Sequence, residues 1–492
     1  MSNDSPFIIG LDFGSHISSL AIWSSEKDSI DVVADDTGSR AIPCTIAFRN
    51  EEVLVGQAAV NQQYKNSQNT FDDVLSLFLN SSENDTIFVN ALDKDISPAD
   101  LMTHFFRNIH NQVKSQIGSV VRDCILSVSH IENESLKSRL IAAAQAGGIR
   151  IKSIIDESAA ILLAYGMDDV NILDSNAIVI DIGWKKTSIS IYSIKGGVFH
   201  LLGEDISYDI NGNILVNLVA EHCAKDFQRK AKFSCMDNQR AMIRLKRECE
   251  SAIKILAMGA EANISVDSLC EGIDYTGKIS RARFEDLCAF PFNQLKLGLT
   301  NSLSSLKLSP GAINYVCFGG GCTSHPKVVS IVKSVFPDAI LSKLSRLETS
   351  EAVCVGATIH GRILSQSGFL SNLPKSTPEI PCIIDKSIAI GDSEKGPFAT
   401  ILPFNASLPF ESCSWISTIY SDAYFKIFSL DSSGDEQKTC LLYQISIPTP
   451  DASVNNPTRL KLVSRVEVTG EMNISIFIDG SNEPIKSFTI SS

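Results

Sequence analysis

The sequence has 492 residues, of which 44% are hydrophobic and 20% charged, a composition typical of a soluble chain with about two to four domains. The net charge of −13 argues against a large nucleic-acid surface, so we expect no direct contact with DNA. No apolar run approaches the ~18 residues of a membrane span, and the N-terminus lacks the pattern of a signal segment. Since the 13 cysteines are scattered without metal-binding spacing, we expect free thiols, a cytoplasmic location and no membrane contact.

Residues 9–23 and 177–192 share one pattern, in which a buried strand runs into an Asp-x-Gly turn and a second, alternating strand follows. Aligned without gaps, the two stretches match Asp12 with Asp181 and Gly14 with Gly183. Turns of this kind can close backbone N–H groups on a phosphate, and an Asp at a strand end can order metal-bound water. This internal repeat predicts two related halves with a nucleotide between them, although two unrelated hairpins would also give this pattern.

Three further stretches predict the elements that surround these hairpins. Residues 154–166 predict a short strand and then a helix, and residues 313–327 predict a strand that ends in glycines before a helix. Residues 244–259 predict an amphipathic helix. The polar or glycine residues that stand out in these stretches are Asp156, Glu157, Glu250, Lys254, Gly320 and Gly321.

In this order the blocks resemble the nucleotide-binding domain of the DnaK-type heat-shock chaperones. The stretches SRARFEDLC (280–288) and DSLCEGIDY (267–275) resemble family signatures almost letter for letter, and the resemblance runs from about Ile8 to Leu364. It implies an α/β, actin-like (ribonuclease-H-like) two-lobed ATPase domain over residues 1–364. ATP and Mg²⁺ are the cofactors that this resemblance implies.

The resemblance also implies which residues form the nucleotide site. On the phosphate side they are Asp12, Gly14, Ser15, His16, Glu157, Asp181, Gly183, Lys185 and Lys186. On the adenosine side they are Glu250, Lys254, Gly320 and Gly321, while Ile253 and Ser324 replace basic residues of the family. By the same resemblance, Asp12, Glu157 and Asp181 would hold the Mg²⁺ ion through water.

Several of these positions depart from the family pattern. His16 replaces a threonine, Asp73 follows Phe71-Asp72 where the family has alanine, and Val74 stands at the catalytic lysine. A valine can neither orient an attacking water nor stabilise charge on the γ-phosphate, so we assign no catalytic residue. We expect hydrolysis to be lost or vestigial.

The second phosphate turn departs furthest from the family, because Trp184 and Lys185 replace glycines and Lys186 replaces a threonine. One interpretation is that either lysine holds a phosphate as a point charge. The other is that Trp184 fills the space and the lysines are solvated. The sequence leaves both interpretations open.

The C-terminal third has a different composition. Residues 365–381 read as a proline-containing linker, and residues 382–492 alternate with period two, which predicts a small all-β sandwich. It resembles a truncated form of the family's β substrate-binding domain, without the helical lid. Four of its aromatic residues, Phe404, Phe410, Trp415 and Phe428, could line a peptide groove or pack in the core. Ser129 replaces the proline of the family's interdomain switch.

Together these departures resemble the atypical subunit of the ribosome-associated complex, the partner of the J-domain protein zuotin, and its animal counterpart. The resemblance implies a cytoplasmic, ribosome-associated subunit that binds ATP with little or no hydrolysis and forms a heterodimer with a J-domain protein. It would reach the ribosome mainly through that partner and stimulate a separate, active chaperone on nascent polypeptides. The alternative is a slow, lidless, peptide-binding ATPase; a sugar kinase is disfavoured by the β-rich C-terminal part.

Overall fold

The computed structural model describes residues 7–35, 38–118, 120–128, 134–344, 347–366, 387–392, 396–402, 410–418, 422–430, 440–449, 458–466, 472–479, 481 and 483–490. The chain divides into two compact units, of which the first is built from most of the chain up to Asn372 and the second mainly from Leu373–Ser492.

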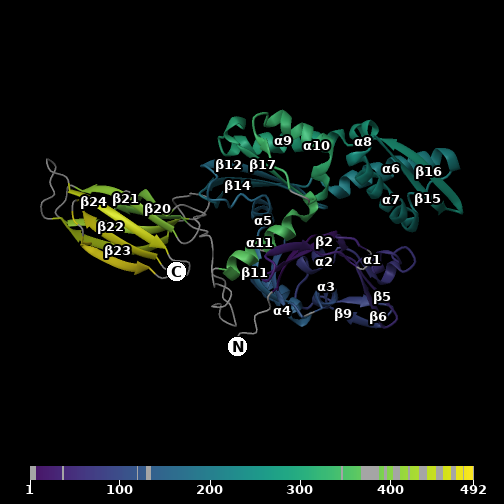
Figure 1. Cartoon of the computed structure of the whole chain (residues 1–492), viewed down its shortest axis with the longest axis horizontal. Coiled ribbons are helices and arrows are strands. Elements are labelled where there is room, and N and C mark those ends of the chain that lie inside the picture. The colour runs from purple at the N-terminus through teal and green to yellow at the C-terminus, as the bar shows by residue number, and fades with distance from the viewer. Residues whose placement is uncertain are drawn as a thin grey trace. The chain divides into compact units, whose positions relative to one another are not determined.

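The first unit has two lobes with the same sheet topology (Figure 1). The order is β11–β10–β1–β2–β3 in the first lobe, where β4 also pairs with β2, and β14–β13–β12–β17–β18 in the second. The first sheet contains β1 (Phe7–Phe13), β2 (Ile17–Ser24), β3 (Ser29–Val32), β4 (Ile42–Pro43), β10 (Asp123–Val128) and β11 (Arg150–Ile155). The second contains β12 (Ser175–Ile182), β13 (Thr187–Lys195), β14 (Val198–Ser207), β17 (Tyr315–Gly319) and β18 (Ile340–Leu341).

The strand register confirms the predicted internal repeat. β1 pairs antiparallel with β2 so that Asp12 lies opposite Ser19, and β12 pairs antiparallel with β13 so that Asp181 lies opposite Ser188. Each hairpin is extended by parallel strands, β10 beside β1 and β17 beside β12. The two Asp-x-Gly turns are therefore equivalent positions of one duplicated sheet.

Each lobe has its own hydrophobic core. The central strands are nearly continuous apolar runs because both of their faces are covered by helices. In the first lobe Phe13 stacks on Phe105, with ring centroids 4.7 Å apart. In the second lobe the buried core includes Ile180, Phe227 and Phe284.

The helices between the two sheets are α5 (Glu157–Ala164) and α11 (Ala352–Gln366), which pack against each other (Figure 1). Asp156 caps α5 by accepting hydrogen bonds from the N–H groups of Ser158 and Ala159. Glu157 is therefore the first helical residue after β11, as the sequence predicts. α11 continues past Leu364 to Gln366.

The remaining elements of the first lobe cover its sheet and form two small antiparallel sheets, β6–β5–β7 and β8–β9. Their bounds are β5 (Ile46–Arg49), β6 (Glu52–Val55), β7 (Thr70–Phe71), β8 (Ile87–Val89), β9 (Lys94–Ile96), α1 (Gln57–Val60), α2 (Val74–Leu79), α3 (Pro98–Ile117) and α4 (Glu134–Ala146).

The second lobe carries a helical extension made of α6 (Gly212–Ala231) and α7 (Gln239–Met258), the hairpin of β15 (Glu261–Cys270) and β16 (Ile273–Ser280), and α8 (Arg281–Leu287). α7 is the predicted amphipathic helix; Leu245, Cys249 and Leu256 of its apolar face are buried. α9 (Ala289–Ser305) and α10 (Pro326–Val335) pack together on the same lobe, and α10 begins with Pro326 as expected.

His325 caps α10 and makes the second lobe sensitive to acid. Its Nδ1 accepts a hydrogen bond from the Lys327 N–H at 3.2 Å, and its ring lies 4.8 Å from that of Phe284. Burial, with a smaller contribution from Arg281, lowers the pKa of His325 to about 4. An unfolded chain takes up this proton near the ordinary pKa of 6.5. The stability that the neutral His325 contributes is therefore fully present above pH 6.5 and is lost as the pH falls toward 4.

We expect protonation of this single histidine to lower the free energy of unfolding by on the order of 2 kcal/mol between pH 7 and pH 4.5. The variant His325→Asn keeps a capping acceptor but cannot titrate, so its stability should fall less over that interval. Urea unfolding at the two pH values measures both slopes. Equal acid losses in the two proteins would show that His325 is not the responsible group.

The second unit contains only strands in its described residues, in two four-stranded antiparallel sheets, β20–β19–β22–β23 and β21–β24–β25–β26 (Figure 1). The strands are β19 (Ser387–Asp392), β20 (Gly396–Leu402), β21 (Phe410–Thr418), β22 (Asp422–Leu430), β23 (Cys440–Pro448), β24 (Thr458–Val466), β25 (Met472–Ile478) and β26 (Lys486–Ile490). Along β24, Leu460 and Leu462 are buried and Arg459 is exposed, as the alternation predicts. This confirms the all-β prediction for the C-terminal part.

The structure describes the side chains of ten cysteines, and all ten are free thiols, buried except for the half-buried Cys322. This agrees with the expectation of free, mostly buried thiols. Within the same residues, none of the helices combines the length and the apolar character needed to cross a membrane.

Candidate functional site

The two equivalent turns touch each other. Trp184, in the β12–β13 turn, stacks on His16, in the β1–β2 turn, with ring centroids 3.8 Å apart and planes 12° from parallel. The rings belong to different lobes, so the stack bridges the cleft between them. An offset or parallel stack of this kind contributes roughly 0.5–1.5 kcal/mol beyond the burial of its area.

Contacts within the second lobe fix the position of Trp184. The Gly183 N–H donates to the Lys186 carbonyl at 3.0 Å, which closes a tight turn, and the Asn213 N–H donates to the Trp184 carbonyl at 3.0 Å. A Cβ atom at Gly212 would lie 2.9 Å from Cε3 of Trp184. The indole is thus wedged between His16 and the start of α6, which agrees with the interpretation that Trp184 fills this space.

Lys185 reaches across to the first lobe. Its Nζ forms an ion pair with Asp73 and donates to Ser76 Oγ at 3.0 Å. Asp73 is the N-cap of α2, where its side chain also accepts from the Ser76 N–H. Neither sequence interpretation of Lys185, phosphate-bound or merely solvated, describes this contact.

Lys186 lies among the three acidic residues that the resemblance assigns to the metal. Its Nζ is 3.2 Å from Glu157 Oε2. Burial lowers the pKa of Lys186, but Glu157 and Asp181 raise it by more, so the ammonium stays charged. Burial and the charge of Glu157 also raise the pKa of both Asp12 and Asp181, which for a carboxyl favours the neutral form.

Carboxylate oxygens are the ligands that Mg²⁺ prefers, so Asp12, Glu157 and Asp181 have suitable chemistry. Within the described residues, however, no three His, Cys, Asp or Glu side chains form a group that could hold a metal ion. The Lys186 ammonium already forms the ion pair with Glu157. In this arrangement the Lys186 ammonium, and not a divalent ion, neutralises Glu157.

On the adenosine side, the Glu250 carboxylate contacts both His16 and Lys254. Its Oε2 is 3.2 Å from His16 Nε2 and its Oε1 is 2.7 Å from Lys254 Nζ. Burial raises the pKa of Glu250, but its contacts with His16 and Lys254 outweigh burial and lower the pKa to about 2. The contact between His16 and Glu250 is a further contact between the lobes.

Two of the matched glycines are required by the protein's own backbone. A Cβ at Gly14 would lie 2.5 Å from the Ile17 carbonyl oxygen. Gly320 has φ +75°, and a Cβ there would collide with the Ile182 carbonyl. Their presence is therefore explained without a phosphate.

The other predicted residues lie at the edge of this arrangement. Ser15 is half-buried in the β1–β2 turn. Gly321 is exposed and starts a short 3₁₀ turn, in which Ser324 Oγ donates to its carbonyl at 3.0 Å. Ile253 packs against the second lobe's core.

Val74, at the position of the family's lysine, faces the interior of the first lobe. It is the first residue of α2, it is completely buried, and it belongs to the same core as Phe78. Val74 is therefore a core residue in this structure.

Sequence reasoning missed Asp73 and Ser76 as partners of the altered turn. A signal was present, since Asp73 replaces an alanine in the family pattern while Lys185 replaces a glycine, which adds opposite charges at two distant positions. Ser129 and Phe404 lie outside the described residues, as do the side chains of Phe410, Trp415 and Phe428. The groove prediction therefore stays a prediction.

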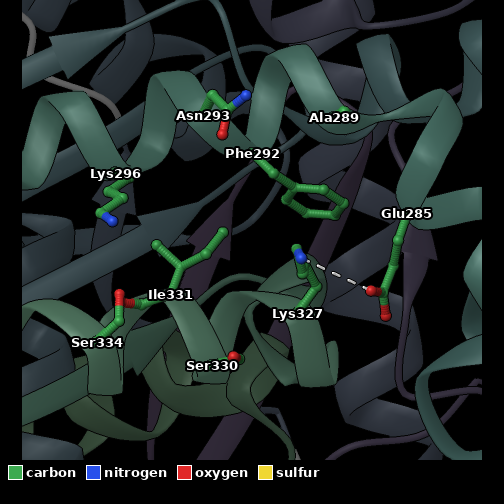
Figure 2. Close-up of a pocket in the computed structure, with 9 residues that line it drawn as sticks. All are labelled: Glu285, Ala289, Phe292, Asn293, Lys296, Lys327, Ser330, Ile331 and Ser334. Atoms are coloured by element: carbon green, nitrogen blue, oxygen red, sulfur yellow. Dashed lines mark hydrogen bonds and ion pairs between the residues drawn. The ribbon is translucent and has the colours of Figure 1, made fainter.

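A separate pocket of about 290 Å³ lies between α9 and α10 on the second lobe (Figure 2). Phe292 and Ile331 supply apolar surface, and Lys327 forms an ion pair with Glu285 at 3.8 Å beside it. None of the predicted nucleotide-site residues lines this pocket.

Two lobes with a duplicated sheet and paired Asp-x-Gly turns define the actin-like, ATPase-type class of fold. The family model described as "Hsp70 protein" matches residues 8–373. The chain belongs to the Hsp70 family.

Several relatives are similar over most of the chain. The chain is 30% identical over 426 residues to "Heat shock 70 kDa protein 14" of Xenopus tropicalis, covering 82% of this chain and 83% of that protein. It is 28% identical over 440 residues to "Heat shock cognate 70 kDa protein 3" of Dictyostelium discoideum, covering 83% and 68%. It is 26% identical over 501 residues to the "Heat shock 70 kDa protein" of Neurospora crassa, covering 96% and 76%.

Proposed function

We propose that this Hsp70-family chaperone does not turn over ATP and acts as a subunit that binds a J-domain protein. The observation that carries the proposal is that residues at altered positions of the cleft contact one another. Trp184 stacks on His16, and Lys185 pairs with Asp73. Side chains that are satisfied by each other are not arranged to orient a γ-phosphate and an attacking water.

The chemistry of hydrolysis supports the same conclusion. The position of the family's lysine is a buried valine, and the acid next to the metal position is paired with Lys186. Each lost electrostatic group typically lowers the rate by ~10²–10³, although such losses need not add. Members of the family in general bind ATP with Mg²⁺. We propose that any ATP this chain takes up stays intact.

The proposed partner is a J-domain protein of the zuotin type, and the proposed place of action is the ribosome. The support is the set of departures from the family pattern together with the similarity to proteins named heat shock 70 kDa protein 14. The net charge of −13 disfavours direct binding to ribosomal RNA. A heterodimer that reaches the ribosome through its partner, and stimulates a separate chaperone on nascent chains, fits this charge.

We expect the purified full-length chain to show no ATP turnover above background during a day with Mg²⁺, with or without the J-domain protein. The variant His16→Thr should show none either, because one restored hydroxyl leaves Val74 and the altered turn unchanged. Chromatography of bound and free nucleotide measures both. An active Hsp70 from the same preparation scheme serves as the positive control.

Partner binding is tested by mixing the chain with a purified zuotin-type J-domain protein. We expect a stable heterodimer in gel filtration and co-sedimentation with ribosomes only when the partner is present. Steady accumulation of ADP would instead support the alternative, a slow peptide-binding ATPase. Absence of a complex would reject the proposed partner.

A further inference from the structure

We propose that the side chains at the cleft form a latch that holds the two lobes closed without nucleotide and without a divalent ion. We define the cleft latch as three contacts: Lys185–Asp73, Lys186–Glu157 and His16–Trp184. The inference rests on the proposed function, in that a chain without turnover needs no cycle of opening and closing. It assigns to these residues a role that nucleotide and metal would otherwise fill.

The first contact joins two departures of opposite charge. Lys185 belongs to the second lobe and Asp73 to the first, and Lys185 also donates to Ser76 of α2. Either substitution alone would leave a charge without a partner in the cleft. Together they form a bridge from the β12–β13 turn to the N-terminus of α2.

The second contact places a fixed positive charge among the acids. Lys186 is half-buried and 3.2 Å from Glu157, which follows β11 of the first lobe's sheet. A tethered ammonium acts at a high effective concentration, so it competes strongly with an ion from solution.

The third contact is an aromatic stack between two further departures. His16 of the first lobe lies flat on Trp184 of the second, and His16 Nε2 is also 3.2 Å from Glu250 on α7. Trp184 is backed by Gly212 at the start of α6. The stack therefore connects the β1–β2 turn to both helices of the second lobe's extension.

The latch predicts that closure does not depend on ligands. The test uses the full-length chain, freed of nucleotide and kept in EDTA, and follows amide hydrogen exchange of residues 14–17 and 183–187. We expect the same protection, within about twofold, after addition of ATP with Mg²⁺. The triple variant Trp184→Gly, Lys185→Gly, Lys186→Thr restores the family residues and should lose at least about tenfold in protection in EDTA.

Lys195→Thr is the matched control, because Lys195 is an exposed lysine at the end of β13, the strand that follows the altered turn. It should behave as the wild type. Lys186→Thr alone provides a milder variant should the triple variant fail to fold, and the protection of α9 reports whether the lobe is intact.

Two results would overturn the latch: wild-type protection that rises about tenfold or more on addition of ATP with Mg²⁺, or variants whose turns stay as protected as the wild type. Neither result involves turnover. A failed latch with no hydrolysis would leave the proposed function standing, whereas hydrolysis by a protein with an intact latch would reject the proposed function alone.

Discussion

Replacing Gly356 with alanine is expected to destabilise the first unit by about 3 kcal/mol or to prevent its folding. Gly356 lies on α11, directly against α5. A Cβ atom there would come far inside 3.0 Å of the carbonyl carbon and oxygen of Ala160, a separation that real Cβ atoms essentially never show. Because the obstacle is helix backbone, only a shift of α5 could relieve it.

Such a shift would also displace the site, since α5 begins at Glu157 and α11 lies between the two sheets. The measurement is thermal or urea unfolding of the purified chain, with the soluble yield recorded beside it. Gly311→Ala is the matched control, because a Cβ at Gly311 would meet nothing within 4 Å. A Gly356→Ala protein as stable as the control would contradict the close packing of α5 on α11.

Restoring the family's lysine with Val74→Lys is expected to lower stability by on the order of 3–5 kcal/mol and to give no ATP turnover. Val74 is completely buried in the first lobe's core, in contact with an apolar environment that includes Phe78. An ammonium group placed there must be buried without a partner or must force α2 to move. The nearest acid that could receive it, Asp73, is already paired with Lys185.

Val74→Met separates charge from size, because methionine is also long but uncharged and usually costs less than about 3 kcal/mol in a core. Urea unfolding of the three proteins gives the free energies, and ADP release gives the turnover. If Val74→Lys were stable and hydrolysed ATP, the side chain at this position would have to face the cleft. Val74 alone would then account for the absence of ATP hydrolysis in the wild-type chain.

Much of the fold could be predicted from short stretches of sequence. The Asp12 and Asp181 hairpins, the helix that starts at Glu157 and the helix that carries Glu250 are all where the sequence places them. The periodicity of neighbouring residues predicts each of these elements, and the turn or cap residue at its end predicts where it stops or starts. The family resemblance then supplied the actin-like, two-lobed class of the fold.

The site was less predictable. The sequence showed that Trp184, Lys185 and Lys186 depart from a phosphate turn, but it left two interpretations of them. The structure supports a filled space at Trp184, and for the lysines it shows ion pairs with Asp73 and Glu157 that neither interpretation contains. Val74 stands where the resemblance places the family's lysine, and it lies in the core of the first lobe.

Local sequence patterns thus predicted the duplicated sheets, their Asp-x-Gly turns and the β-rich C-terminal part, and the resemblance placed Val74 at the position of the family's lysine. Which side chains meet follows from the packing of the lobes, because His16 and Trp184, or Lys185 and Asp73, are far apart in the chain and belong to different lobes. Contacts of this kind depend on how two independently formed cores pack around α5 and α11. No local sequence pattern encodes that packing. Complementary changes at distant positions can therefore be recognised only in the folded structure, where the two side chains are in contact.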